Sequence, residues 1–186
     1  MKSAVYIIFS LGYFFLLSCN NPFAPALIDE AAPRSRILTL QKTPKEVLDN
    51  FRYAYTFKDS LIYSDIFDST FIFKSFDYNQ APPQPIEWGR DTELRTTARM
   101  FRYFSTLDVV WNTISNPDTV SAPNSLHPER DLVIEHTVTF TLTLDGGRVI
   151  PPLIGDVLFQ FVKREFIRRG KTDYKYYINL WKDQKI

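Results

Sequence analysis

The chain is poor in the residues that bind metals and phosphates. It has one cysteine, two histidines and six glycines among 186 residues. A single cysteine excludes a disulfide within the chain, and His127 and His136 supply too few further donors for a zinc site. The glycines at positions 89, 146, 147, 155 and 170 are too scattered to form a phosphate-binding loop. We therefore expect no metal and no cofactor.

An excess of charge of one sign is also lacking. The 22 basic and 21 acidic residues give a net charge of +1. A nucleic-acid-binding protein needs a clustered positive field. The one basic cluster, residues 163–171, is interrupted by Glu165 and followed by Asp173. We interpret it as the solvated end of a hairpin and expect no nucleic-acid partner.

No apolar run is long enough to cross a bilayer, which takes about 20 residues in a helix. The longest, residues 4–17, follows Lys2 in the order typical of a signal peptide. It ends in Leu16-Leu17-Ser18-Cys19, which resembles the bacterial lipobox, where the chain is cleaved before a cysteine that receives a lipid. We predict a signal peptide at 1–18 and lipidation of Cys19. The alternative is an ordinary secretory signal cleaved elsewhere, which would leave Cys19 a free, oxidisable thiol.

The segment after Cys19 is spaced by prolines at positions 22, 25 and 33 and has little apolar periodicity. This pattern predicts a semi-extended tether over residues 19–42, with one folded domain over residues 43–186. The expected location is the bacterial cell envelope, with the lipid as membrane anchor. Asn20 is not the aspartate associated with inner-membrane retention, which favours the outer membrane.

Two helices are expected at the start of the domain. Thr43 is a suitable N-cap, Pro44 suits the first helical position, and Glu46 can complete a capping box. This helix should run to about Lys58. Asp59 can cap a short second helix, and the segment "STFIFKSF" after it is strand-like, with its phenylalanines on one face.

A third helix should open at Gly89 or Asp91. The prolines of residues 79–91 exclude a helix interior or a central strand, so this segment is expected to be a loop. This third helix should bury an apolar stripe of Leu94, Thr97, Ala98, Phe101 and Phe104. After it come residues 106–115 and then a proline-containing loop to Arg130.

The clearest strand is residues 132–144, where apolar and polar residues alternate with period two. His136 falls on the apolar face. Two further strands, residues 156–169 and 174–183, are separated by glycine-containing turns, and the last should place Ile178 and Trp181 on opposite faces. Helices followed by antiparallel strands indicate the α+β class.

The segments "TPKEVLDNFRYAYTFKDSLIYSDIF", "WGRDTELRTTARMF" and "YINLWKD", with a strand after the first, resemble the NTF2-like superfamily in its SnoaL-like, ketosteroid-isomerase-like branches. The resemblance covers residues 43–183. It implies a cone in which a curved antiparallel sheet wraps around three N-terminal helices and encloses a cavity. It also implies that a homodimer can form through the outer face of the sheet.

Enzymes of this superfamily perform acid–base chemistry inside an apolar cone. No residue-by-residue match to their catalytic sets is found, so no catalytic residue is assigned. Candidates for the cavity lining are Tyr53, Asp65, Tyr103, Trp111 and His136. His136 could instead be a core histidine bonded to a buried carbonyl or hydroxyl, or lie exposed at the mouth of the cone.

Three functions are compatible with the sequence. The leading hypothesis is a non-catalytic envelope lipoprotein that binds a small apolar ligand or an envelope protein. The alternative is an isomerase, lyase or hydrolase with His136 as general base. A third is a structural subunit that dimerises through its sheet. Two or more convergent ionisable groups in the cavity would favour the enzyme, and a collapsed cavity would favour the structural subunit.

Overall fold

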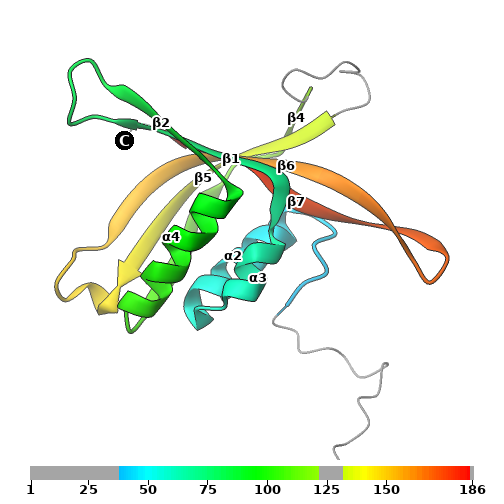
Figure 1. The fold of residues 1–186 in the computed structure, drawn as a ribbon, viewed down its shortest axis with the longest axis horizontal. Helices are drawn as coiled ribbons and strands as arrows, with labels where there is room; N and C mark the ends of the chain where they lie inside the picture. The colour runs from blue at the N-terminus through cyan, green and yellow to red at the C-terminus, as the bar shows by residue number, and fades with distance from the viewer. Residues whose placement is uncertain (1–37, 122–131, 185–186) are drawn as a thin grey trace, which may run out of the picture. The chain divides into compact units, whose positions relative to one another are not determined.

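The computed structural model describes residues 38–121 and 132–184 (Figure 1). The predicted signal peptide, Cys19 and most of the predicted tether lie outside these residues. Within the described ranges, no helix combines the length and apolarity needed to cross a membrane. The elements are α2 (Pro44–Phe57), α3 (Ser60–Asp65), β1 (Phe67–Asp77), β2 (Gln84–Gly89), α4 (Arg90–Tyr103), β3 (Leu107–Ile114), β4 (Asp118–Ser121), β5 (Leu132–Leu144), η1 (Asp145–Gly147), β6 (Leu153–Arg168) and β7 (Lys171–Gln184).

The strands form one curved sheet in the order β2-β1-β7-β6-β5-β3, with β4 also paired to β5. The helices lie on its concave side (Figure 1). The α+β class is as predicted, but two details differ. The sheet is mixed because β1 pairs with β7 in parallel. Two strands, the predicted β1 and the unpredicted β2, precede α4, so the three helices are not all N-terminal to the sheet.

The start of α2 forms as its sequence predicts. The Thr43 hydroxyl accepts a hydrogen bond from the Glu46 amide at 3.2 Å, and Pro44 occupies the first turn. The Glu46 carboxylate accepts from the Lys42 amide at 2.7 Å, one residue earlier than in a standard capping box. The helix ends at Phe57 because Lys58 adopts a left-handed conformation, with φ of 53°.

The predicted loop at 79–91 contains strand β2, so that prediction was wrong for residues 84–89. Pro85 is tolerated because β2 lies at the edge of the sheet and pairs, among the described strands, with β1 alone, so a missing amide donor breaks no second ladder. The predicted loop before Arg130 likewise contains β4, a short strand whose residues pair with Leu132–Glu135 of β5.

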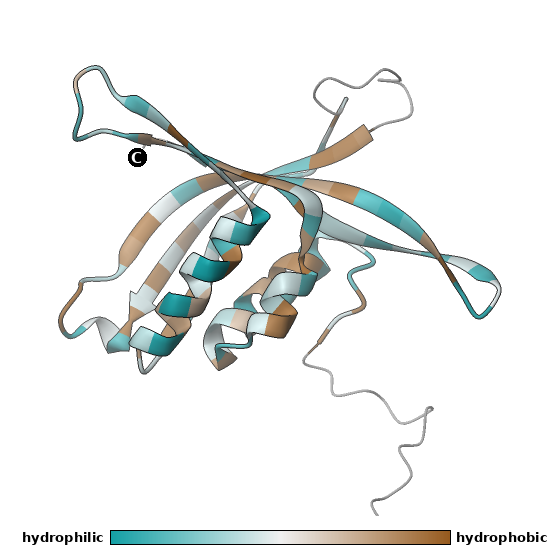
Figure 2. Cartoon of the chain, viewed as in Figure 1, coloured by the Kyte–Doolittle hydropathy of each residue, from teal (hydrophilic) through white to brown (hydrophobic). Residues whose placement is uncertain are grey.

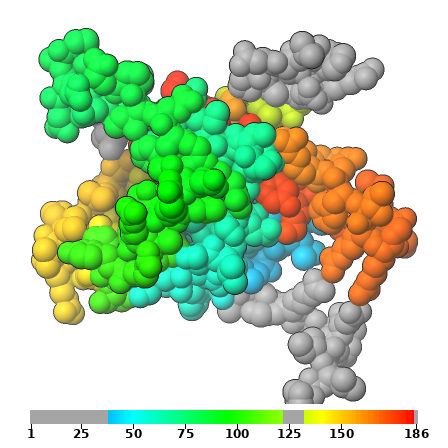
Figure 3. All heavy atoms as spheres, in the orientation of Figure 1, coloured from blue at the N-terminus to red at the C-terminus, as the bar shows by residue number. Residues whose placement is uncertain are grey.

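Aromatic side chains fill most of the space between helices and sheet. The ring of Phe51 on α2 is the centre of this core. Its centroid lies between 4.8 and 6.4 Å from six other rings. In the space-filling view α4 lies against α2 and α3 over the sheet (Figure 3). The six rings around Phe51 belong to Tyr55, Tyr63, Phe67, Trp111, Phe159 and Trp181.

On β5 the buried side chains of His136, Val138 and Leu144 share one face, as the alternation predicts, and Figure 2 shows hydrophobic and hydrophilic stretches along the strands of the sheet. On β7 the period breaks. Ile178 pairs with Phe161 and Leu180 pairs with Gln160, so Asn179 is one extra residue and forms a bulge. The prediction that Ile178 and Trp181 face opposite sides was therefore wrong, since Trp181 joins the core beside Phe51 at 5.7 Å.

The folded unit begins before Thr43. The Thr39 amide donates to the Asn50 side chain at 2.9 Å, and the Gln41 carbonyl accepts from the Tyr176 amide on β7 at 2.8 Å. Gln41 is 1% exposed. The predicted domain boundary at 42/43 was thus several residues too late, because residues 39–42 are bound to α2 and β7.

Candidate functional site

A small cavity remains between α2 and the concave face of the sheet, with a volume of about 90 Å³. We call it the inner cavity. Its lining is almost entirely apolar, and one face of α2 and four strands supply it. The Trp111 indole is fixed there, because its Nε1 donates to the Leu48 carbonyl at 3.0 Å. The lining residues are Phe51, Tyr55, Val109, Trp111, Phe140, Leu142, Phe159 and Trp181.

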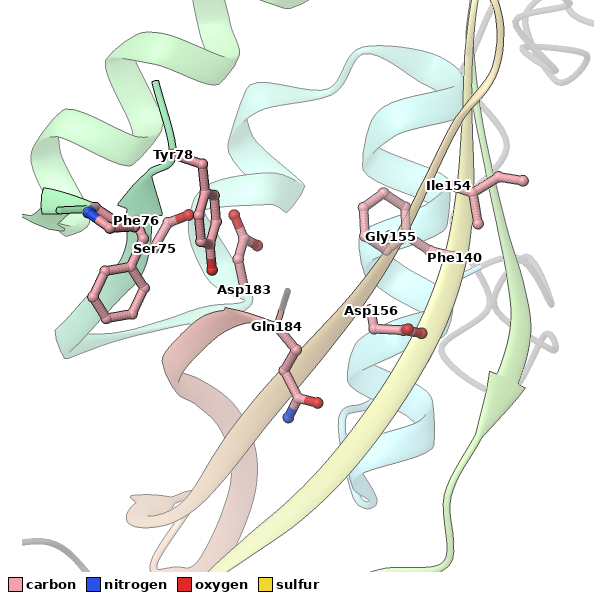
Figure 4. A pocket seen from close by; sticks show the side chains of 10 residues that line it. Ser75, Phe76, Tyr78, Phe140, Ile154, Gly155, Asp156, Asp183 and Gln184 are labelled. Atoms are coloured by element: carbon pink, nitrogen blue, oxygen red, sulfur yellow. The ribbon is translucent and has the colours of Figure 1, made fainter. Parts of the chain in front are cut away.

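A larger, open depression of about 730 Å³ lies at one end of the sheet (Figure 4). We call it the outer cleft. It opens because the pairing of β1 with β7 stops at Lys74 and Lys182, after which the β1–β2 hairpin diverges. In Figure 4 residues of that hairpin face residues of β5 and β6 across the gap. The cleft is lined by Ser75, Phe76, Tyr78, Pro83, Phe140, Ile154, Gly155, Asp156, Asp183 and Gln184.

Two side chains connect the inner cavity with the outer cleft. Phe140 lines both. Trp181 lines the inner cavity, and its Nε1 donates to Oδ1 of Asp183 in the outer cleft at 2.9 Å. A molecule in the cleft that displaced the Phe140 ring would therefore reach the aromatic interior.

Asp183 is the carboxylate with the most perturbed environment in the cleft. Burial raises the pKa of this group above its ordinary value, although hydrogen bonds from Trp181 and Ser75 lower it in part. Asp156, on β6, accepts a hydrogen bond from the Thr139 hydroxyl at 2.5 Å. The cleft thus holds two acidic groups whose recorded partners are neutral.

The buried carboxylate of Glu93 lines neither the inner cavity nor the outer cleft. Glu93 on α4 is 5% exposed and accepts from the Tyr63 hydroxyl at 2.7 Å and the Thr97 hydroxyl at 2.9 Å. Its other oxygen accepts from Nε1 of Trp88 at 2.8 Å. Burial and the Glu93 charge raise the pKa of Tyr55 far above its ordinary value, so this hydroxyl stays neutral.

Of the five predicted lining residues, the structure places only Trp111 in the inner cavity. Tyr53 lies on the other side of α2, in a groove with Asp108 and Val110 of β3. Tyr103 is 82% exposed at the end of α4, and Asp65 forms an exposed ion pair with Lys175 at 2.9 Å. These three residues do not line the inner cavity. The sequence could not show this, because helix periodicity alone does not fix which face of a helix meets the sheet.

His136 points to the concave side, as the alternation of β5 predicts, and is 8% exposed. Its Nδ1 lies 2.8 Å from the Ser115 carbonyl oxygen, and its ring packs edge-on against Phe161 at 5.8 Å. It belongs to neither the inner cavity nor the outer cleft. This is the core histidine bonded to a carbonyl, one of the alternatives left open by the sequence.

Sequence reasoning missed Phe140 and Asp183, and it did not select Tyr55 because core packing explained that residue equally well. Tyr55 and Phe140 lie in apolar patterns that identify a buried face, and burial alone does not distinguish cavity lining from filled core. Asp183 lies near the end of the chain and gives no local signal. Its role depends on the divergence of β1 from β7, which is a tertiary feature. Among the described residues, no group of three or more metal-ligating side chains occurs.

No family model matches the chain, and no curated protein matches it. An NTF2-like protein of unknown function from Shewanella baltica is similar in structure, with a TM-score of 0.46, 12% identity, and coverage of 75% of this chain and 88% of that one. The Bd1075 protein of Bdellovibrio bacteriovorus has a TM-score of 0.47 at 10% identity, covering 76% of this chain and 39% of that one.

An NTF2-like protein of unknown function in nutrient uptake, from Rhodospirillum rubrum, has a TM-score of 0.44 at 13% identity, covering 75% of this chain and 95% of that one. With TM-scores below 0.5, these likenesses carry no argument. NTF2-like proteins are among the structures similar to this chain. The predicted α+β class, with a curved sheet around helices, is confirmed by the described residues themselves.

Proposed function

We propose that this protein is a lipid-anchored binding protein of the bacterial cell envelope whose cone holds a small, largely apolar molecule. One observation carries the proposal: the aromatic inner cavity adjoins the outer cleft, and the Phe140 side chain lines both. A pre-formed concavity with an apolar lining and a few polar groups is the usual form of a small-molecule site.

The two volumes indicate how such a ligand would be held. The inner cavity, at about 90 Å³, has room for a group of only a few heavy atoms, since one water accounts for about 30 Å³ of liquid. The outer cleft, at about 730 Å³, is within the roughly 300–1,000 Å³ typical of ligand sites. The ligand would therefore place an apolar tip in the inner cavity and its larger part in the outer cleft.

Within the inner cavity, the placement of the ionisable groups favours binding over the enzyme with His136 as base, while the two carboxylates Asp156 and Asp183 belong to the outer cleft. A general acid or base must come within hydrogen-bonding reach of the substrate. Among the described residues, Tyr55 is the one ionisable side chain that lines the inner cavity, and its raised pKa keeps it neutral. His136 contacts the Ser115 carbonyl and lines neither space. The enzyme hypothesis with His136 as base therefore receives no support from this geometry.

A fluorescence titration with N-phenyl-1-naphthylamine, a neutral apolar probe, tests the binding function. We expect saturable binding by the mature chain (residues 19–186, Cys19→Ser). Leu142→Trp should abolish it by filling the inner cavity, whereas Thr141→Trp, the neighbouring position on the opposite face of β5, should preserve it. Thermal melts would verify that both variants fold. Absence of binding, or equal binding by both variants, would refute the proposed site.

The anchoring depends on Cys19. In a bacterial host, the full chain should incorporate labelled fatty acid and sediment with the outer membrane, and Cys19→Ser should incorporate none. Several acyl chains anchor firmly, since each buried methylene contributes about 0.8 kcal/mol. An unlabelled, soluble wild-type protein would end the anchoring proposal and leave the binding proposal untouched.

A further inference from the structure

The charged side chains that line the outer cleft indicate which charge its ligand carries. Two of its lining residues, Asp156 and Asp183, are acidic, and none of the described lining residues is basic. Three aromatic rings, those of Phe76, Tyr78 and Phe140, line the same space. Organic cations are bound by carboxylates, through their negative charge, and by the faces of aromatic rings, through the ring quadrupole.

Two partly buried carboxylates elsewhere in this domain have cationic partners, whereas the buried Glu93 accepts from neutral donors. Asp68 is paired with Arg164 at 2.8 Å, and Asp173 is paired with Lys42. In the outer cleft, by contrast, Asp183 accepts from an indole and Asp156 from a hydroxyl. Neither forms an ion pair with any residue in the described ranges 38–121 and 132–184. Their negative charges are therefore uncompensated by the protein that the structure describes.

An uncompensated carboxylate in a partly buried site is costly, and that cost is relieved by a ligand of opposite charge. An anionic ligand would meet two like charges, and a neutral ligand would gain at most hydrogen bonds from them, without the charge attraction. We propose that the outer cleft selects a positively charged amphiphile, an organic ammonium ion whose head lies between Asp183 and the aromatic rings while its apolar tail points past Phe140. This inference rests on the proposed binding function and specifies its ligand class.

Three probes with the same tail and different heads test the charge selectivity: hexyltrimethylammonium, 1-hexanol and hexanesulfonate. Each would displace N-phenyl-1-naphthylamine from the mature chain (residues 19–186, Cys19→Ser). Two opposite charges about 4 Å apart attract by about 1 kcal/mol even at the dielectric constant of water, which corresponds to about fivefold in affinity. We therefore expect the ammonium probe to bind at least about fivefold more tightly than hexanol, with the sulfonate weakest.

Two variants locate the effect. Asp183→Asn keeps the acceptor for the Trp181 indole and removes its charge, so the preference for ammonium over hexanol should fall severalfold, with Asp156 and the aromatic rings supplying what remains. Asp108→Asn makes the same change in net charge at an exposed position on β3, in the separate groove with Tyr53, and should keep the preference. Melting curves would show that both variants remain folded.

The possible failures are distinguishable. Equal affinity for ammonium and hexanol, or a preference that Asp183→Asn leaves unchanged, would overturn the inference while leaving the binding function in place. If N-phenyl-1-naphthylamine itself did not bind, the proposed function would fail and this inference with it.

Discussion

The ring of Phe140 lies across Gly155, the residue opposite it on the neighbouring strand. A Cβ atom at position 155 would stand 2.7 Å from Cε1 and 2.8 Å from Cζ of this ring. Gly155 does not have a positive φ, so it is the neighbouring ring and not the backbone conformation that requires glycine here. The pair sets the position of the ring that separates the inner cavity from the outer cleft.

Gly155→Ala should displace the Phe140 ring and destabilise the domain by about 1–3 kcal/mol, the usual cost of overpacking. Urea denaturation measures the free energy of unfolding. In the double variant with Phe140→Leu the added methyl group should cost much less, because the smaller side chain leaves room for it. Additive effects of the two substitutions would show that the ring and the glycine are not coupled.

Much of the fold could be predicted from local patterns. Thr43, Pro44 and Asp59 identified the starts of two helices, and the alternation of β5 placed His136 on the correct face. The parallel pairing of β1 with β7 and the bulge at Asn179 were not predictable, because both depend on contacts between segments far apart in the chain. The bulge alone moved Trp181 into the core.

The candidate site was less accessible to sequence reasoning than the fold. Trp111 was identified as an amphipathic ring suited to a cavity wall. The outer cleft could not be identified, since it exists only because two paired strands separate beyond Lys74 and Lys182. Asp183 becomes notable only when its burial and its neutral partners are known.

Tyr63→Phe should destabilise the domain by about 1–3 kcal/mol, because it removes one of three donors to the buried Glu93 carboxylate. Tyr103→Phe, which makes the same chemical change at an 82% exposed position, serves as the control and should change stability by less than about 0.5 kcal/mol. Equal unfolding midpoints for the two variants would mean that the Glu93 network contributes no net stability.

The ion pair of Asp68 with Arg164 predicts a loss of stability in acid. Burial alone would raise the pKa of Asp68, but hydrogen bonds from Arg164 and Thr70 outweigh it and lower the pKa from 3.8 to about 2. A depressed pKa in the folded state stabilises the fold above pH 3.8, and this contribution disappears as the pH falls towards 2. The shift corresponds to roughly 1–2 kcal/mol after allowance for solvent screening at the half-exposed Arg164.

Asp68→Asn should therefore be less stable than wild type by about that amount at pH 7 and equal to it near pH 2, as measured by urea denaturation at several pH values. Asp65→Asn breaks the exposed ion pair with Lys175 and should differ from wild type by less than about 1 kcal/mol at pH 7. If the free energy of unfolding differed between Asp68→Asn and wild type by the same amount at pH 7 and at pH 2, the lowered pKa of Asp68 would not contribute to stability.

Residues 39–42 should contribute strongly to stability although they precede the first helix. Asn50, 4% exposed, bonds to the amide and carbonyl of Thr39, and the Lys42 ammonium donates to the Tyr174 carbonyl at 2.6 Å. A chain that begins at Thr43 would leave the Asn50 side chain and the Tyr176 amide without these partners. Each lost hydrogen bond costs about 0.5–1.5 kcal/mol, so the total should be about 2–4 kcal/mol.

Urea denaturation of residues 35–186 and 43–186 measures this contribution. The shorter chain should unfold at a lower urea concentration with a similar dependence on urea, because the same core is exposed on unfolding. In the longer chain, residues 35–186, Asn50→Ala should lower the free energy of unfolding by part of the difference between the two lengths, since it removes only the hydrogen bonds to Thr39. In the shorter chain, residues 43–186, the same substitution should lower it less, because those hydrogen bonds are already absent. Identical midpoints for the two chain lengths would show that residues 39–42 lie against the domain without stabilising it.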